Sequence, residues 1–160
     1  MHSSRAFLLE IALRRILRQV MRIVFDPGSL HQSRGGAITA VVYFDFGNGR
    51  SFPCEGWNDF VVVIANWWTQ AFEQIVTQQE KLKFLFMDGP YWISVVPQGQ
   101  DLRILCVEDR RERGPPCEVV VGLHEMRREL AALVRSVSEA CRKAGIDSSD
   151  LDGLRSTLPN

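Results

Sequence analysis

The sequence lacks the patterns that mark metal-binding, disulfide-rich and strongly charged proteins. Its three histidines lie far apart, and its four cysteines, Cys54, Cys106, Cys117 and Cys141, form no CxxC pair. This spacing argues against a structural zinc site and a disulfide framework, so we expect reduced cysteines and no bound metal. Lysine and arginine together number 19, and so do aspartate and glutamate. A chain with this balance has no overall field that attracts nucleic acid or anionic lipid.

A long uninterrupted apolar run is also missing from the first twenty residues. Glu10, Arg14 and Arg15 break the run, so we expect neither a secretory signal nor a membrane span there. What remains is a predicted amphipathic helix, whose apolar side is formed by Leu9, Ala12, Leu13, Ile16 and Val20. Three interpretations stay open: packing on the domain or on a second subunit in a homodimer, binding to a membrane surface, or an appendage to a domain that begins at Met21.

From Met21 onward the pattern changes to strands. Residues 21–25 (MRIVF) predict a first strand that ends at the turn signal Asp26-Pro27-Gly28. Residues 37–46 (AITAVVYFDF) are rich in β-branched and aromatic side chains, and the GNG that follows them suits a tight hairpin. Residues 50–54 (RSFPC) predict a short returning strand, because Pro53 cannot donate a hydrogen bond to a ladder.

The stretch PCEGWNDFVVVIANWWTQAFEQ, residues 53–74, holds three of the four tryptophans and almost no charge in its middle. We predict a helix from Phe60 to about Gln78, because the segment is too long for one strand and has no turn residue after Gly56. Asn58 or Asp59 is the expected N-cap. Consecutive residues on a helix point about 100° apart. One of Trp67 and Trp68 should therefore lie in the core and the other at its margin.

Further strands and two helices complete the predicted order. The strands are expected near residues 82–86, 91–97, 101–109 and 117–123. The charged residues 108–116 (EDRRERGPP) indicate an exposed loop. A helix from Glu125 to about Ala144 should end at Gly145 in a Schellman motif, and a short last helix is capped by Ser148 or Ser149.

This order predicts the α+β class, with one mainly antiparallel sheet, a buried central helix, and a C-terminal helix packed on the sheet. Residues 21–160 form the single domain, and residues 1–20 are its helix or extension.

No motif in the chain is typical of a particular reaction or cofactor. The carboxylates of Glu55, Asp59 and Asp88 would serve as acid and base if burial separated their pKa values. Simpler roles account for the same residues, since Asp59 suits a helix cap, Asp88 suits a turn with Gly89, and Glu55 suits a solvated surface. We therefore predict no catalytic residue and no cofactor.

Three aromatic residues, Trp57, Tyr91 and Trp92, suggest a different kind of site. Exposed tryptophan and tyrosine are typical of energetically dominant positions in protein–protein interfaces, although these three would equally close the edge of the core. Basic residues are not interleaved with them, so we do not expect a platform on which nucleic-acid bases stack.

The order MRIVF, VVYFDF, FPCEGWNDFVVVIANWW and LKFLFMDGPYWISV, followed by a C-terminal helix and AGI..SDLDGL, resembles a group of small bacterial proteins. Some of these are similar to immunity proteins of polymorphic toxin systems. The resemblance covers about residues 21–154, and its most specific parts are GWNDFVVVI.NWW and FMDGPY. It implies an antitoxin that binds and blocks a cognate toxin and catalyses no reaction of its own.

Taken together, these features predict a cytoplasmic, non-catalytic protein-binding module that occludes a toxin. The expected contact surface consists of Trp57, Tyr91 and Trp92, with a polar rim of Glu55, Asp59 and Asp88. Acidic groups at such a rim suit a basic partner. Two alternatives stay open: a small enzyme that uses the same carboxylates, and a scaffold subunit that self-associates through residues 1–20.

Overall fold

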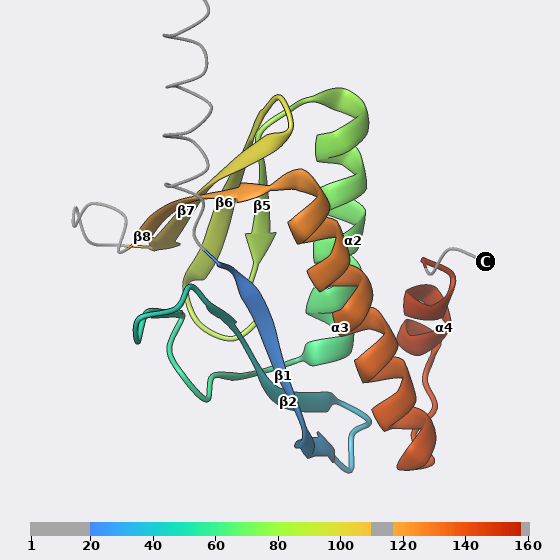
Figure 1. The fold of residues 1–160 in the computed structure, drawn as a ribbon. Helices are drawn as coiled ribbons and strands as arrows, with labels where there is room; N and C mark the ends of the chain where they lie inside the picture. The colour runs from blue at the N-terminus through green and yellow to red at the C-terminus, as the bar shows by residue number, and fades with distance from the viewer. Residues whose placement is uncertain (1–19, 110–116, 158–160) are drawn as a thin grey trace, which may run out of the picture.

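The described chain, residues 20–109 and 117–157 of the computed structural model, contains two antiparallel sheets and three helices (Figure 1). The predicted α+β class is confirmed. The expected single main sheet is wrong, because the strands divide into an N-terminal sheet, β1 to β4, and a C-terminal sheet, β5 to β8. The predicted helix in residues 1–20 and most of the predicted loop at residues 108–116 lie outside the described residues. The elements are β1 (Arg22–Gln32), β2 (Ile38–Asp45), β3 (Ser51–Phe52), β4 (Asn58–Asp59), α2 (Val61–Gln78), β5 (Leu82–Leu85), β6 (Tyr91–Gln98), β7 (Asp101–Glu108), β8 (Cys117–Gly122), α3 (Leu123–Lys143) and α4 (Ser149–Arg155).

The first strand does not end at the Asp26-Pro27-Gly28 signal, so that prediction is wrong. β1 continues to Gln32, and its register with β2 shifts between Asp26 and His31. The turn residues form a bulge: the Gly28 amide donates to the Asp26 carboxylate at 2.9 Å, and the Ser29 hydroxyl accepts from the Val41 amide of β2 at 2.7 Å. A bulge can absorb such residues within an antiparallel pair without ending it.

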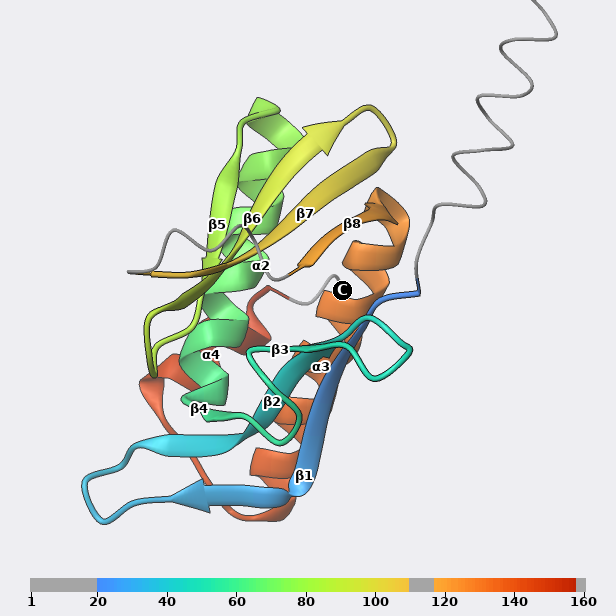
Figure 2. The same cartoon turned by 90° about the vertical axis from the view of Figure 1, so that its left-hand side faces the viewer.

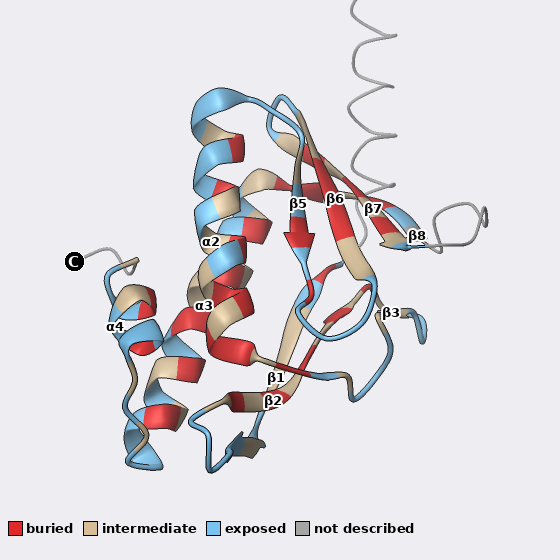
Figure 3. Ribbon diagram, turned by 180° about the vertical axis from the view of Figure 1, so that it is seen from behind, coloured by how far each residue is buried: buried red, intermediate tan, exposed pale blue. Residues whose placement is uncertain are grey.

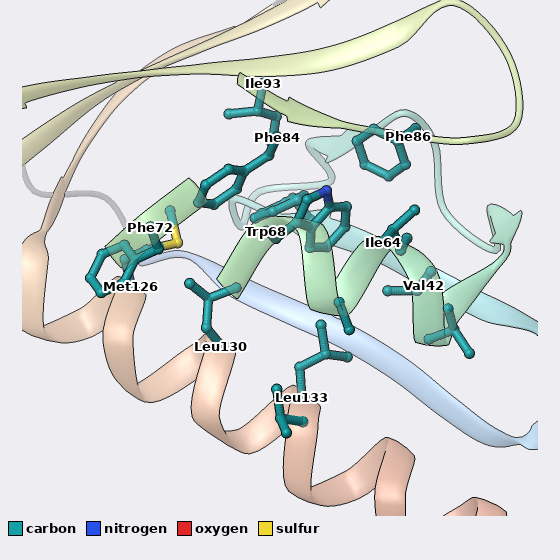
Figure 4. Packing of buried hydrophobic residues seen from close by; sticks show 14 of the residues in the cluster. Val42, Ile64, Trp68, Phe72, Phe84, Phe86, Ile93, Met126, Leu130 and Leu133 are labelled. Carbon is teal, nitrogen blue, oxygen red and sulfur yellow. The ribbon is translucent and has the colours of Figure 1, made fainter. Parts of the chain in front are cut away.

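The predicted central helix is confirmed as α2, which contacts the C-terminal sheet, β2, α3 and α4. Trp68 is fully buried and donates its indole N–H to the Leu85 carbonyl at 2.8 Å, whereas Trp67 is 42% exposed. Figure 4 shows Trp68 between Phe84 and Phe86, above the Leu130 side of α3. The large apolar fraction of this segment is therefore explained by burial on several sides.

The predicted N-cap of this helix is wrong. Asn58 and Asp59 form β4, which pairs with Val41 and Ala40 of β2, and the cap position belongs to Phe60. Asp59 still accepts a hydrogen bond from the Phe60 amide at 2.7 Å, so its carboxylate meets the start of the helix from one residue earlier. Because Asp59 pairs with Ala40 in β4, the N-cap position of α2 falls to Phe60 instead.

The C-terminal helices follow the sequence prediction closely. α3 begins two residues before the expected start, and it buries the predicted apolar stripe of Met126, Leu130, Leu133, Val134, Val137 and Cys141. Its end has the predicted Schellman geometry, with Gly145 at φ +66° and the Ile146 amide bonded to the Cys141 carbonyl at 2.9 Å. Ser148 caps α4 by accepting from the Leu151 amide. Figure 3 shows the buried residues gathered where the helices and the two sheets meet.

Two glutamates of α3 bind backbone amides of the chain around the start of β1. Glu125 accepts from the Met21 amide at 3.2 Å, and Glu129 accepts from the Ile23 amide at 2.9 Å. Residues four apart on a helix lie on one face, and alternate strand residues direct their amides the same way. The spacing of the two glutamates therefore matches the spacing of the two amides and ties the N-terminal sheet to α3.

Candidate functional site

The carboxylate of Asp59 joins the two sheets. It is 1% exposed and accepts from the Trp57 indole at 3.1 Å and from the Phe60 amide at 2.7 Å. The Asp88 amide, in the turn between β5 and β6, lies 3.2 Å from each of its oxygens. Asp59 was predicted at a polar rim, and this prediction is wrong: the side chain is buried and acts as an internal acceptor.

Trp57 and Tyr91 pack against each other at this junction. Their ring centroids are 5.0 Å apart at an interplanar angle of 78°, and Tyr91 also meets the Phe52 ring edge-on at 5.8 Å. Gly89 lies beneath both rings: a Cβ there would sit 2.8 Å from Tyr91 and 3.2 Å from Trp57. Both aromatic side chains are half-buried, so their principal role is to close the junction.

Trp92 lies on the opposite side of the strand from Tyr91. Successive side chains of a strand point to opposite faces, and Ile93, on the side of Tyr91, is fully buried. The three predicted contact aromatics therefore do not form one surface. Trp57 and Tyr91 belong to the junction, and Trp92 belongs to the outer face of the C-terminal sheet, the face turned away from α2. Figure 2 looks onto this sheet, with α2 behind the strands.

Trp92 forms an apolar row with its cross-strand neighbours. Leu85 pairs with Trp92, and Trp92 pairs with Val107, so the three side chains stand side by side on the outer face. Leu85 is 45% exposed, and the other two are half-buried. The Lys83 ammonium lies 4.4 Å from the centroid of the Trp92 ring. We call Leu85, Trp92 and Val107 the Trp92 row.

Acidic side chains lie at the end of the sheet next to the Trp92 row. Asp88 is exposed in the β5–β6 turn, Glu108 pairs with Tyr91, and the Asp109 amide donates to the Pro90 carbonyl at 2.8 Å. Asp88 and Asp109 are thus exposed at this end of the sheet, whereas the side chain of Glu108 lies on the Tyr91 side, opposite the Trp92 row. The next residues in the chain, 110–116, contain three arginines and one glutamate and lie outside the described part.

Glu55 lies in a different environment, a shallow hollow of about 210 Å³ between β2 and the residues that follow it. Tyr43 and Asp45 line the same hollow. Partial loss of water around the Tyr43 hydroxyl, followed by the negative charges of Glu55 and Asp45, raises the pKa of Tyr43. Glu55 is exposed and has no contact with Asp59 or Asp88 among the described hydrogen bonds, so the three predicted carboxylates are not assembled into one site.

Cys106 and Cys141 occupy positions suited to packing rather than to nucleophilic chemistry. Cys141 is on the buried stripe of α3, and burial raises the pKa of its thiol, which disfavours the reactive thiolate. Cys106 is buried in β7, and Cys54 is exposed in a turn. Within residues 20–109 and 117–157, no three His, Cys, Asp or Glu side chains are placed to hold a metal ion.

The Trp92 row was only partly found from the sequence, because Leu85 and Val107 were not singled out. The available signal was the strand alternation, which places residues of β5, β6 and β7 on one face once the pairing is known.

Comparisons with protein-family models, with curated proteins and with solved structures find no match for this chain. None of the helices in the described residues has the length and apolar character needed to cross a membrane.

Proposed function

We propose that this chain is a non-catalytic protein-binding module of the immunity type, which binds a toxin and occludes its active site. The observation that carries the proposal is the Trp92 row, an apolar row on an open sheet face beside acidic side chains. A cytosolic location in a bacterium is part of the proposal and rests on the resemblance described above.

The row has the composition expected of an interface centre. Tryptophan is enriched among residues whose loss costs most binding energy, and the surrounding contacts exclude water from it. Leu85 and Val107 flank the Trp92 indole. The Lys83 side chain, which lies over the Trp92 ring, can move away when a partner binds or remain at the polar edge of the interface. Asp88 and Asp109 at the adjoining end favour a partner with a basic surface, because complementary charge speeds association and sets orientation.

The alternative of a carboxylate-pair enzyme receives no support from this geometry. A catalytic acid or base needs a carboxylate that can exchange a proton with a substrate. The Asp59 oxygens already accept from three donors, and Asp88 reaches them through its backbone amide while its side chain faces solvent.

The test is a protection assay with the protein encoded directly upstream, the expected place of a cognate toxin gene. We expect that protein to arrest bacterial growth and the present chain to relieve the arrest. Trp92→Ala and Leu85→Asp should abolish the relief and weaken binding in titration calorimetry by about 30-fold or more, the loss expected when a residue worth about 2 kcal/mol is removed.

Matched controls are available on other surfaces of the molecule. Trp67→Ala removes a tryptophan that is 42% exposed on α2, and Met87→Asp changes an apolar residue with 47% exposure, close to the 45% of Leu85. Both controls should keep full protection. Equal protection by all four variants would show that the row is not the contact surface. Recovery of no stoichiometric protein partner from the source cell would contradict the binding function itself.

A further inference from the structure

The outer face of the C-terminal sheet carries a group of apolar side chains. In an antiparallel sheet with one solvated face, outward positions are mainly polar. Here five of the eleven outward positions of β6, β7 and β8 are apolar, and all five of these side chains are half-buried. The outward apolar residues are Trp92, Val96, Leu105, Val107 and Val120, together with Leu85 of β5.

No described element packs on this face. The contacts of the sheet with α2 and α3 run through its inner side, where Phe84, Ile93 and Val121 are fully buried. Ser94, at the centre of the outer face between Lys83 and Leu105, is only 3% exposed, because larger neighbours surround it. Ser94 is therefore a low point among the apolar and charged side chains of this face.

We propose that residues 1–20 fold back as an amphipathic helix on the outer face of the C-terminal sheet and cover it in the free protein. The point of attachment supports this occupant. Glu125 accepts hydrogen bonds from the Met21 amide and from the amide of Gly122, the last residue of β8. The chain thus enters the described fold beside the β8 edge, and Val20, the last residue of the predicted apolar side, is 64% exposed there.

The dimensions of the segment and of the face agree. Twenty helical residues extend about 30 Å, and a strand of eight residues, the length of β6 and β7, extends about 26 Å. Gly122 pairs with Asp101, at the opposite end of the sheet from the Trp92 row. The C-terminal end of the proposed helix, at Val20, lies at this end of the sheet. A helix that runs from there along the strands therefore places its N-terminal residues at the Trp92 row.

The charges are complementary. Residues 1–20 contain four arginines and Glu10, a net charge of +3. On the outer face, Lys83 and Arg103 are balanced by Asp101 and Glu118, and Arg103 already forms an ion pair with Glu118; the exposed turn residues Asp88 and Asp109 bring the net charge to −2. Residues 110–116 are not included in this sum. Opposite charges favour this segment over a neutral one on the same face.

If the function proposed above is correct, the segment competes with the toxin for the Trp92 row. Its arginines imitate the basic surface of that partner, so the partner binds only after the segment has left. The consequence rests on the proposed function, whereas the docking of residues 1–20 does not.

The docking is tested by photo-crosslinking in the full chain. A benzophenone amino acid at position 13, on the predicted apolar side, is compared with the same group at position 15, about 200° away on a helix. We expect position 13 to cross-link to peptides of β6, β7 or β8 with a severalfold higher yield than position 15. A mixture of light and ¹⁵N-labelled chains separates cross-links within one chain from those between chains.

A second variant keeps the proposal falsifiable. Leu105→Asp places a charge at the centre of the outer face without touching the inner core, and it should abolish the position-13 cross-links while the thermal unfolding transition is retained. Cross-links only between chains would assign the segment to self-association and overturn the proposal, and so would equal yields from both positions. The cross-links do not depend on any toxin, so they persist if only the proposed function is wrong.

Discussion

The carboxylate of Asp59 is joined to the backbone amide of Asp88, with both oxygens 3.2 Å from the nitrogen. This contact links β4 of one sheet to the β5–β6 turn of the other, and the Trp57 indole and the Phe60 amide share the same acceptor. This buried side chain therefore helps to hold the two sheets together at the junction, where the Trp57–Tyr91 and Phe52–Tyr91 ring contacts also join them.

Replacement of Asp59 is expected to destabilise the fold. Asp59→Ala leaves three donors without their acceptor, and we expect the free energy of unfolding to fall by about 3 kcal/mol in urea denaturation. Asp88→Ala is the matched control, because it removes an exposed side chain and keeps the amide that makes the contact; its change should stay within about 0.5 kcal/mol. Similar losses for both variants would contradict the assigned role of Asp59.

Gly89 is expected to tolerate no side chain. Its φ of +76° disfavours other residues, and an added Cβ would meet Tyr91 at 2.8 Å. Gly89→Ala should therefore cost about 2–3 kcal/mol, from the backbone conformation and the displaced rings together. Gly99→Ala, with a similar φ of +64° and open space around it, should cost only about 1 kcal/mol. Thermal denaturation of both variants measures the difference, and equal losses would exclude a clash.

The two adjacent tryptophans are expected to differ in their effect on stability. Trp68→Ala removes a fully buried ring and its hydrogen bond to Leu85, and should lower the free energy of unfolding by about 3–5 kcal/mol. Trp67→Ala should change it by about 0.5 kcal/mol, as for other surface positions. Chemical denaturation followed by far-ultraviolet circular dichroism distinguishes them. A larger loss of stability in Trp67→Ala than in Trp68→Ala would mean that α2 is rotated so that Trp67, rather than Trp68, faces the core.

Glu129 is expected to protect the Ile23 amide of β1 from hydrogen exchange. Glu129→Ala removes the acceptor of the Ile23 amide, so that amide should exchange with deuterium faster, and stability should fall by about 1–2 kcal/mol. Amide exchange followed by NMR reads the single position. Arg128→Ala, at the exposed neighbouring residue, should leave the exchange of Ile23 unchanged, and an unchanged rate in Glu129→Ala would remove this link between β1 and α3.

Glu139 is expected to titrate at unusually low pH. Hydrogen bonds from the Arg142 guanidinium, at 3.0 and 2.8 Å, lower the pKa of Glu139 from 4.5 to about 2. Because this pKa is depressed in the folded state, the stabilisation is present above the ordinary carboxyl value and is lost as the pH falls through about 2. Arg142→Gln should return the pKa of Glu139 towards 4.5, as measured by NMR of the carboxyl carbon, whereas Arg128→Gln should not change it.

Local patterns predicted most elements of this fold. The spacing of Met126, Leu130 and Leu133 indicated α3 and its buried side, and Gly145 indicated its end, because both signals act within a few residues of the chain. The bulge in β1 was missed because Asp26-Pro27-Gly28 has the same local chemistry in a turn and in a bulge. Only the register with β2, and the bond from the Val41 amide to Ser29, distinguish the two.

The sequence alone therefore determined the class of the fold, the central helix and the aromatic residues worth testing, because helix periodicity and strand alternation are local properties. Tertiary structure alone decided that there are two sheets, that Asp59 is an internal acceptor, and that Trp92 faces away from Trp57 and Tyr91. These outcomes depend on which strands pair and which groups meet across the chain. Asp59 and the Asp88 amide are 29 residues apart, a separation over which composition and spacing specify no contact.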